Sequence, residues 1–352
     1  MAVTHRDTQR RFDAVSVIVV VLLLAVVLPA MLDTFRLNLI SKYLAFSFVA
    51  IGIVLAWGYG GVLSLGQGVF FGMGGYMMAM FLKLEASAPE LPDFMVWSSV
   101  EKLPVWWQPF HSLGWTVLGI LVIPAVLAWL FSYSIFRRRV SGVYFAIVTL
   151  ALALTLTVVV IGQQGDTGGA NGITDFRTLL GWDIVSDAGK RTMYFVEVAA
   201  VSIAMVLSLV IVRSRFGKIL IAIRDREDRV RFSGYNTAHM KAFVFAVAAM
   251  LSSIGGAFYS LQAGLIAPSV IGAVASVEMV IYAAVGGRLS VPGAVIGALL
   301  IGFLKSYLSE TYPEGWLFVL GAVFILVVWA MPNGLAGLIT RMPWQRGPGG
   351  TP

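Results

Sequence analysis

The sequence contains no cysteine and only three histidines among its 352 residues. Without cysteine, the chain can form no disulfide bond and has no thiol to serve as a nucleophile or metal ligand. The histidines, at positions 5, 111 and 239, fall in separate loops, so the sequence offers no histidine pair with metal-binding spacing. We therefore expect neither a metal centre nor a bound cofactor.

The sequence also lacks the phosphate-binding loop G-x-x-x-x-G-K-[ST]. Residues 216–219 (FGKI) contain the Gly-Lys pair, but neither the preceding glycine nor the following hydroxyl. No pair of a nucleophile and a base is evident either. The chain is therefore not expected to be an enzyme or to hydrolyse ATP itself.

Charged residues are scarce, at 12% of the chain, whereas hydrophobic residues make up 59%, and the mean hydropathy is +0.87. A soluble protein of this length could not bury so much apolar surface in one core. Apolar runs of about 20 residues, the length of a helix that crosses a bilayer, recur along almost the whole chain. The sequence therefore predicts an all-α integral membrane protein, a polytopic bundle of about eight to ten transmembrane helices.

The apolar runs place the expected helices at 14–32, 39–57, 62–83, 113–136, 142–161, 192–212, 242–264, 291–308 and 316–332. A shorter segment, 276–287, is expected to be re-entrant or broken. The first run follows Arg6, Arg10 and Arg11, but it is longer than a signal-peptide core and has no convincing cleavage site. We therefore expect it to remain as the first helix of the protein.

The net charge of +7 comes from basic residues that cluster between the apolar runs, so a nucleic-acid partner is not expected. The positive-inside rule assigns such segments to the cytoplasm. It predicts a plasma-membrane protein with a cytoplasmic N-terminus (1–13), one transmembrane domain (14–340) and a cytoplasmic tail (341–352). The domain would have outer loops at 84–112 and 162–191, and a cytoplasmic loop at 213–241.

Residues 58–80, "GYGGVLSLGQGVFFGMGGYMMAM", contain eight glycines within an apolar run. An interior glycine costs a helix up to about 1 kcal/mol relative to alanine, so the run predicts close packing, a broken helix or a passage. Ser64 and Gln67 are expected to face a solute route. Five glycines are expected either to let helices slide or break around that route, or only to pack tightly: Gly66, Gly68, Gly72, Gly74 and Gly75.

Two carboxylates fall within apolar segments, Glu197 near the outer end of its helix and Glu278 in the short segment 276–287. Two carboxylates without a histidine make a poor proton relay, so ion coupling is not favoured. Glu278 is expected either to lie at the outer interface or cap a neighbouring helix, or to line a pathway. No cationic residue is evident along the expected pore, which is a mild argument for an uncharged solute.

The cytoplasmic loop 213–241 predicts an amphipathic helix. An apolar stripe recurs at helical spacing, and the segment "RDREDR" (224–229) alternates charges on the rest of the turn. The stripe consists of Phe216, Ile219, Leu220, Ile223 and Val230, and Gly234 is placed to end the helix. The mixed charges favour docking into a groove of a partner protein, with a helix lying on the lipid surface as the alternative.

Five ordered motifs resemble the permeases of branched-chain amino-acid type ABC importers, in particular the second of the two permeases. They are "GYGGVLSLGQGVFFGMGGYMMAM", "SGVYFAIVTLALALTL", "GGANGITDF", "GKILIAIRDRE" followed by "SGY", and "AVGGRLSVPGAVIGALLI". The resemblance runs from about residue 40 to residue 335. Within it, "LPDFMVW", "LPVWWQPF" and the ending "YPEGWLFVLGAVFILVVWAMPNGLAGL" are most similar to the urea importer permease.

The resemblance implies a heterodimer with a second permease, two cytoplasmic ATP-binding subunits and a periplasmic or extracellular solute-binding protein. It also implies that an element fitting the ATPase contains Gly217, Ile223, Arg224, Asp225, Glu227 and Gly234. The chain departs from the family at Arg229, Val230 and Arg231, where small residues are usual, which puts contacts at that end in doubt. In the outer loop, Asn171 and Asp175 are expected to fix turns rather than touch solute.

These features predict a permease subunit of an ATP-driven ABC importer that forms, with a second permease, the pathway for urea. One alternative is the same importer class carrying branched-chain amino acids or another small amide. A second alternative, from a different class, is an ion-driven secondary transporter or a passive channel.

Overall fold

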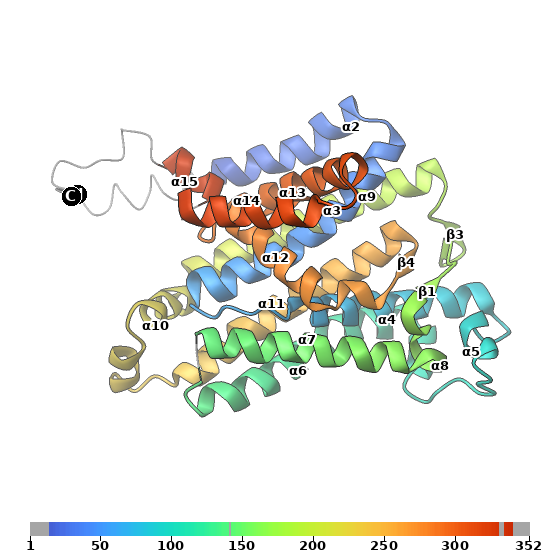
Figure 1. The fold of residues 1–352 in the computed structure, drawn as a ribbon, viewed down its shortest axis with the longest axis horizontal. Helices are drawn as coiled ribbons and strands as arrows, with labels where there is room; N and C mark the ends of the chain where they lie inside the picture. The colour runs from blue at the N-terminus through green and yellow to red at the C-terminus, as the bar shows by residue number, and fades with distance from the viewer. Residues whose placement is uncertain (1–13, 141, 331–333, 341–352) are drawn as a thin grey trace.

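The computed structural model describes residues 14–140, 142–330 and 334–340, and these form one elongated helical bundle (Figure 1). Its long helices are the first span Ala14–Met31, α3 (Thr34–Ile53), α4 (Gln67–Ser87), α6 (Leu113–Arg137), α7 (Val143–Gly162), α9 (Asp187–Arg213), α10 (Arg215–Phe232), α11 (Thr237–Ala263), α12 (Ala273–Gly286), α13 (Val291–Thr311) and α14 (Trp316–Ala330).

Short elements complete the bundle. The first span ends in η1 (Leu23–Val27) and α2 (Leu28–Met31), and the π-helix η2 (Val54–Tyr59) continues α3. The other short helices are α5 (Asp93–Trp97), η3 (Gln108–His111), α8 (Gln164–Thr167), η4 (Gly169–Asn171), η5 (Pro268–Val270) and α15 (Gly334–Thr340). Strand β1 (Ile173–Thr174) pairs with β4 (Leu265–Ile266), and β2 (Thr178–Leu179) pairs with β3 (Trp182–Asp183).

Seven helices in the described part of the chain are long and apolar enough to cross a membrane. They are the first span, α3 with η2, α6, α7, α9, α11 and α13, and α12 is a shorter apolar helix. The prediction of an all-α polytopic membrane protein is therefore confirmed. The expected cytoplasmic termini, 1–13 and 341–352, lie outside the described residues.

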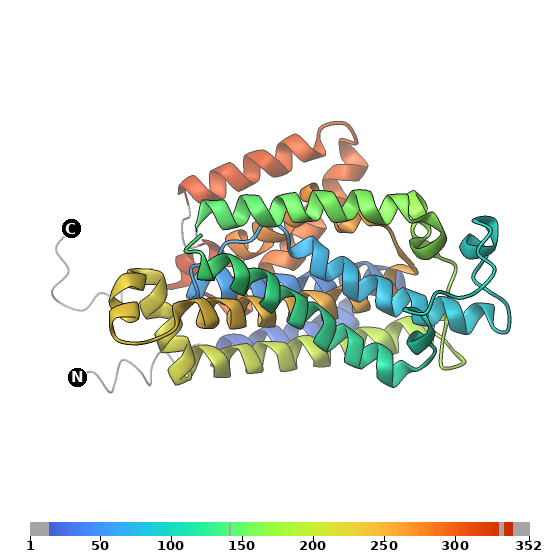
Figure 2. The ribbon, with the colours of Figure 1, turned by 90° about the horizontal axis from the view of Figure 1, so that it is seen from below.

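The bundle has two distinct ends. Helices α10 and α15 lie at one end, whereas α5, α8, β1 and β4 lie at the other (Figures 1 and 2). We call the α10 end the inner end, because the basic residues of α10 predict a cytoplasmic position. The opposite end is called the outer end.

Helices α3, α4 and α11 form the centre of the bundle and approach one another at glycines. A Cβ atom on Gly52 of α3 would lie 2.9 Å from the carbonyl oxygen of Ala248 in α11. Between α4 and α11, a Cβ on Gly74 would overlap the carbonyl oxygen of Ser253, and one on Gly256 would overlap that of Phe71. Glycine therefore permits a backbone separation that no larger residue allows here.

The third expected helix, 62–83, begins later than predicted. Residues 61–64 have no helical structure, and α4 starts only at Gln67. The amide of Leu65 donates to the hydroxyl of Thr149 in α7 (3.0 Å), and the amide of Gly66 donates to the hydroxyl of Ser64 (3.2 Å). Side-chain hydroxyls thus accept hydrogen bonds from the backbone amides before α4, which allows the chain to enter the bundle without forming a helix.

Helices α9 and α11 begin earlier than predicted, so the expected loops 162–191 and 213–241 are shorter. Each helix starts directly after a capping residue. The hydroxyl of Ser186 accepts from the amide of Gly189 (3.1 Å), and the side-chain oxygen of Asn236 accepts from the amide of His239 (3.2 Å). Such caps satisfy amides of the first turn and extend a helix into polar sequence.

Candidate functional site

The starts of α4 and α12 meet inside the bundle. The amide of Gly68, in the first turn of α4, donates to the hydroxyl of Ser276 in the first turn of α12 (3.1 Å). Just before α4, Gly66 lies against the backbone of Thr149, which is in the second turn of α7. The two helix starts are therefore neighbours inside the bundle. Helix N-termini carry partial positive charge, and in many transporters the N-termini of discontinuous helices point at anionic groups of the solute.

Ser64 and Gln67, the expected pathway side chains, lie at this junction but are buried in this conformation. The side-chain oxygen of Gln67 accepts from the hydroxyl of Ser252 in α11 (3.0 Å). The side-chain nitrogen of Gln67 is buried and has no partner among the described residues. A buried donor without a partner is unfavourable, so this amide is a candidate for a hydrogen bond that forms in another conformation.

The expected pathway glycines all contact other parts of the protein. A Cβ on Gly68 would lie 2.7 Å from the carbonyl oxygen of Ile271, and one on Gly72 would overlap the side chain of the same residue. A Cβ on Gly75 would lie 2.6 Å from the side chain of Ile266. In this conformation these glycines serve tight packing around the junction.

Glu278 is buried within α12 rather than exposed at the outer interface, with 6% of its surface exposed. Its carboxylate accepts hydrogen bonds from the hydroxyl of Tyr282 (2.5 Å) and from the ammonium of Lys305 in α13 (2.9 Å). The sequence interpretation missed Lys305. Lysine near the end of an apolar run is typical of an interfacial residue, and only the packing of α12 on α13 reveals that it forms an ion pair inside the bundle.

A second buried carboxylate, Glu197 of α9, has no exposed surface. One of its oxygens accepts from the side-chain nitrogen of Gln262 in α11 (3.4 Å), and the other has no partner in the described part of the chain. The two intramembrane carboxylates thus differ, because Glu278 has a cationic partner and Glu197 has a neutral one.

Helix α10 forms the expected amphipathic element at the inner end. It begins after Ser214, whose hydroxyl accepts from the amide of Gly217 (3.3 Å), and it ends just before Gly234, which has φ +86°. Gly217 and Ile223 are buried, so they lie on the side of α10 that packs against the bundle. Five residues of α10, spaced three or four apart on both sides of Arg226, are exposed, and we call them the exposed stripe: Lys218, Ala222, Asp225, Arg229 and Phe232.

Arg224 connects α10 to the glycine-rich region. Its guanidinium donates to the carbonyl oxygen of Gly58 (2.7 Å), in η2, and to the carboxylate of Asp225 (2.9 Å). Its side chain also lies against Gly61, where an added Cβ would be 3.1 Å away. The helix therefore contacts the segment that leads into α4.

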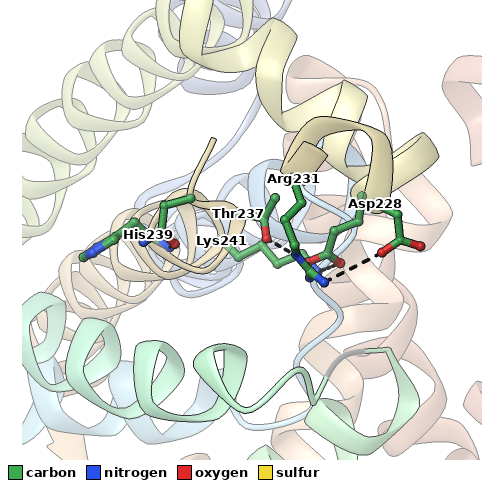
Figure 3. A network of polar contacts seen from close by, with 7 residues as sticks. Asp228, Arg231, Thr237, His239 and Lys241 are labelled. Carbon is green, nitrogen blue, oxygen red and sulfur yellow. Dashed lines mark hydrogen bonds and ion pairs between the residues drawn. The ribbon is translucent and has the colours of Figure 1, made fainter. Parts of the chain in front are cut away.

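Helix α10 is kinked at Arg226, which has φ −151° and ψ 76°. Beyond the kink, Glu227 accepts hydrogen bonds from Arg231 (3.0 Å) and from Thr237 at the start of α11 (3.0 Å), and it forms a short ion pair with Lys241. In Figure 3, Arg231, Thr237 and Lys241 point toward one another between the two helices. The kink allows Glu227 to hold the second half of α10 on α11.

The pKa of Glu227 is lowered in this network. Burial alone would raise the pKa of the carboxyl, but the hydrogen bond and charge of Lys241, the Thr237 hydroxyl and the Arg231 charge together outweigh it. The carboxylate is therefore held in its charged form at neutral pH.

The outer-loop residues lie where the chain turns. Asn171 ends η4 and is exposed, and Asp175 has φ +61° and accepts from the hydroxyl of Thr174 (2.8 Å). Strand β1, directly before Asp175, pairs with β4, which leads through η5 to α12. The loop thus fixes the segment that precedes the junction of α4 and α12.

Comparison with known proteins identifies related transport proteins. Residues 35–328 match the model of a family described as "Branched-chain amino acid transport system / permease component". The chain is 23% identical to the high-affinity branched-chain amino acid transport system permease protein LivM of Escherichia coli, over 90% of this chain and 74% of LivM. It is 24% identical to LivH of the same organism, over 83% of this chain and 91% of LivH.

A sugar permease is also similar. The ribose import permease protein RbsC of Haemophilus influenzae is 23% identical, over 92% of this chain and 93% of RbsC. No solved structure matches the chain.

Proposed function

Since the chain belongs to the branched-chain amino acid transport system permease family, we propose that it is the membrane permease subunit of an ATP-driven importer for branched-chain amino acids. The observation that carries this proposal is the family match over residues 35–328. The membrane-spanning bundle and the exposed stripe of α10 support it, because an importer permease needs a passage and a contact for its ATPase.

We propose that the partners are a second permease, two cytoplasmic ATP-binding subunits and an external solute-binding protein. The exposed stripe of α10 (Lys218, Ala222, Asp225, Arg229 and Phe232) is the surface for the ATPase. Arg224 would pass movement of α10 to the segment before α4, because it hydrogen-bonds Gly58. ATP hydrolysis would take place on the separate subunits.

We place the solute pathway at the junction of α4 and α12. There the unpartnered nitrogen of Gln67 is a donor for a solute carbonyl or carboxylate oxygen. Gly68 lets the start of α4 approach the start of α12, and Gly66 lets it approach Thr149 of α7. Since Gln67 is buried in this conformation, α4 would have to move away from α11 before solute contacts it. Opening at this junction would provide the alternating access that a transporter requires.

Urea remains a second candidate solute. It rests on the likeness of residues 91–97, 103–110 and 312–338 to the urea importer permease. LivM and LivH are named for branched-chain amino acids, so the amino-acid alternative is better supported than urea, the solute first expected from the sequence.

The test is uptake of labelled leucine, with labelled urea in parallel, by cells with and without this gene under limiting nitrogen. We expect leucine uptake to fall without the gene and to return with the wild-type gene. Loss of urea uptake with leucine uptake unchanged would transfer the assignment to urea. If uptake of both solutes survives deletion, the proposed transport function is wrong.

A further inference from the structure

The ion pair between Glu278 and Lys305 joins α12 to α13, with the carboxylate buried and the lysine partly exposed. Glu278 is in the second turn of α12, and Lys305 lies more than one turn before the end of α13, so neither residue is at a helix terminus. Burying charged side chains among apolar helices costs free energy. A buried ion pair often stabilises a protein less than apolar residues of similar volume would. Stability alone therefore does not explain why two charges are placed here.

The pair borders an aromatic cluster on the central helices. Tyr282 donates its hydroxyl hydrogen to Glu278, and its ring centroid lies 5.5 Å from that of Phe46 in α3. The centroid of Phe46 also lies 5.5 Å from that of Tyr259 in α11. The carboxylate, the ammonium and an aromatic wall are therefore within one small region.

Part of this region is not fully buried. The side chain of Lys305 keeps 37% of its surface exposed, and Phe46 and Tyr259 are only partly buried. The ammonium of Lys305 also lies 5.2 Å from the ring centroid of Trp316 in α14. That cation–π contact would hold the lysine in place while its ion pair with Glu278 opens.

An α-amino acid carries an ammonium and a carboxylate on the same carbon. We propose that Glu278 and Lys305 form a binding site on the solute pathway for a zwitterionic α-amino acid with an apolar side chain. Glu278 binds the ammonium, Lys305 binds the carboxylate, and Phe46, Tyr259 and Tyr282 contact the side chain. Insertion of the zwitterion replaces one ion pair by two, so neither protein charge is left unpaired.

This inference rests on the proposed function, since it assigns the solute class of the same importer. It would add a cationic residue, Lys305, to a pathway for which the sequence showed none. Urea has no charged poles, so it could hydrogen-bond to the pair but could not replace it. A simpler explanation is that the pair only links α12 to α13. The experiment must distinguish this structural role from solute binding.

The experiment measures ATP-driven leucine uptake by the complete importer in proteoliposomes, with the wild-type binding protein. The variants are Lys305→Gln and Glu278→Gln. Lys83→Gln serves as the matched control, because Lys83 forms an ion pair of similar length (3.0 Å) with Asp93 outside this region. We expect kcat/KM for leucine to fall about tenfold or more in the two pathway variants and to stay near wild type in the control.

A merely structural pair would not change solute preference, so competition by leucinamide is measured as well. Leucinamide lacks the carboxylate that Lys305 would bind. We expect leucine to compete better than leucinamide in the wild type, and this preference to be clearly smaller in Lys305→Gln, with the contribution of the binding protein the same in both. Because the binding protein is unchanged, any change of preference must come from the permease.

A charge-swapped double variant, Glu278→Lys with Lys305→Glu, gives an independent test. It keeps an ion pair between α12 and α13 but reverses the two poles relative to the aromatic wall. We expect leucine uptake to remain low, whereas recovery would show that the pair is only structural and would overturn the inference.

The wild-type protein distinguishes the inference from the proposed function. If the wild type carries leucine and Lys305→Gln keeps the preference for leucine over leucinamide, the inference is wrong and the proposed function stands. If the wild-type importer carries no leucine, the amino-acid assignment and this inference both fail.

Discussion

Glu227 has a role within the chain that its motif does not reveal. The family resemblance implies that it belongs to the contact with an ATPase, and in the structure its carboxylate binds Thr237 and Lys241 of the same chain. Lys241 is buried, so it depends on Glu227 for its acceptor. Sequence alone could not show this, because the three residues come together only through the kink at Arg226.

Replacing Glu227 by Gln should destabilise the inner end of the bundle. The substitution leaves the buried ammonium of Lys241 without a charged partner, which costs about 1–3 kcal/mol. We expect a lower midpoint of thermal unfolding for the purified protein. Glu101→Gln, at an exposed carboxylate of the outer loop, is the control, and an unchanged midpoint in Glu227→Gln would contradict the role of the network.

The same network predicts a pH dependence. The pKa of Glu227 is lower in the folded protein than its ordinary value of 4.5, so the unfolded chain binds the proton more tightly. The stabilisation is thus present above pH 4.5 and is lost as the pH falls through the lowered pKa. We therefore expect the midpoint of thermal unfolding to fall more steeply with decreasing pH in the wild type than in Glu227→Gln. Parallel plots of midpoint against pH would contradict this role of Glu227.

At Gly256, close packing of α11 on α4 determines how a substitution affects stability. A Cβ there would overlap the carbonyl oxygen of Phe71, so Gly256→Ala should separate α4 from α11 and cost about 1–3 kcal/mol. Gly321→Ala is the matched control, since nothing lies within 4 Å of its added Cβ. We expect only the first variant to lower the unfolding midpoint, and equal midpoints would argue against close contact of these helices.

At the scale of elements, α10 was largely predictable and the start of α4 was not. The spacing of apolar residues predicts the α10 helix, and Gly234 predicts its end. The glycine-rich run predicted a break or close packing but not where either would occur. The non-helical segment before α4 is held by a hydrogen bond to Thr149 of α7, and this contact between distant residues is not visible in the sequence. The Glu278–Lys305 pair was missed for the same reason, since it joins two helices.

The exposed stripe of α10 predicts a specific loss of assembly. Replacing Lys218 and Arg229 together by Glu reverses the charge of two exposed residues of this stripe. We expect the ATPase subunits to stop copurifying with the permease while its unfolding midpoint stays unchanged. Full retention of the ATPases would show that the docking surface lies elsewhere.

At the scale of the whole molecule, the described chain is a membrane bundle whose outside is apolar. Helix α7, for example, exposes Val143, Ile147, Leu154 and Val158. Its interior instead contains the junction of α4 and α12 and the buried carboxylates, and α10 contacts Gly58 at the inner end. Composition sufficed to predict the fold class, whereas solute identity depends on side chains that come from separate helices.

The central claim is that this permease carries branched-chain amino acids at the expense of ATP. The most direct measurement is accumulation of labelled leucine by proteoliposomes that contain the complete importer, with ATP or with ADP available to the ATPases. The account predicts accumulation against the leucine gradient with ATP and none with ADP. No accumulation with ATP, or equal accumulation with ADP, would contradict it.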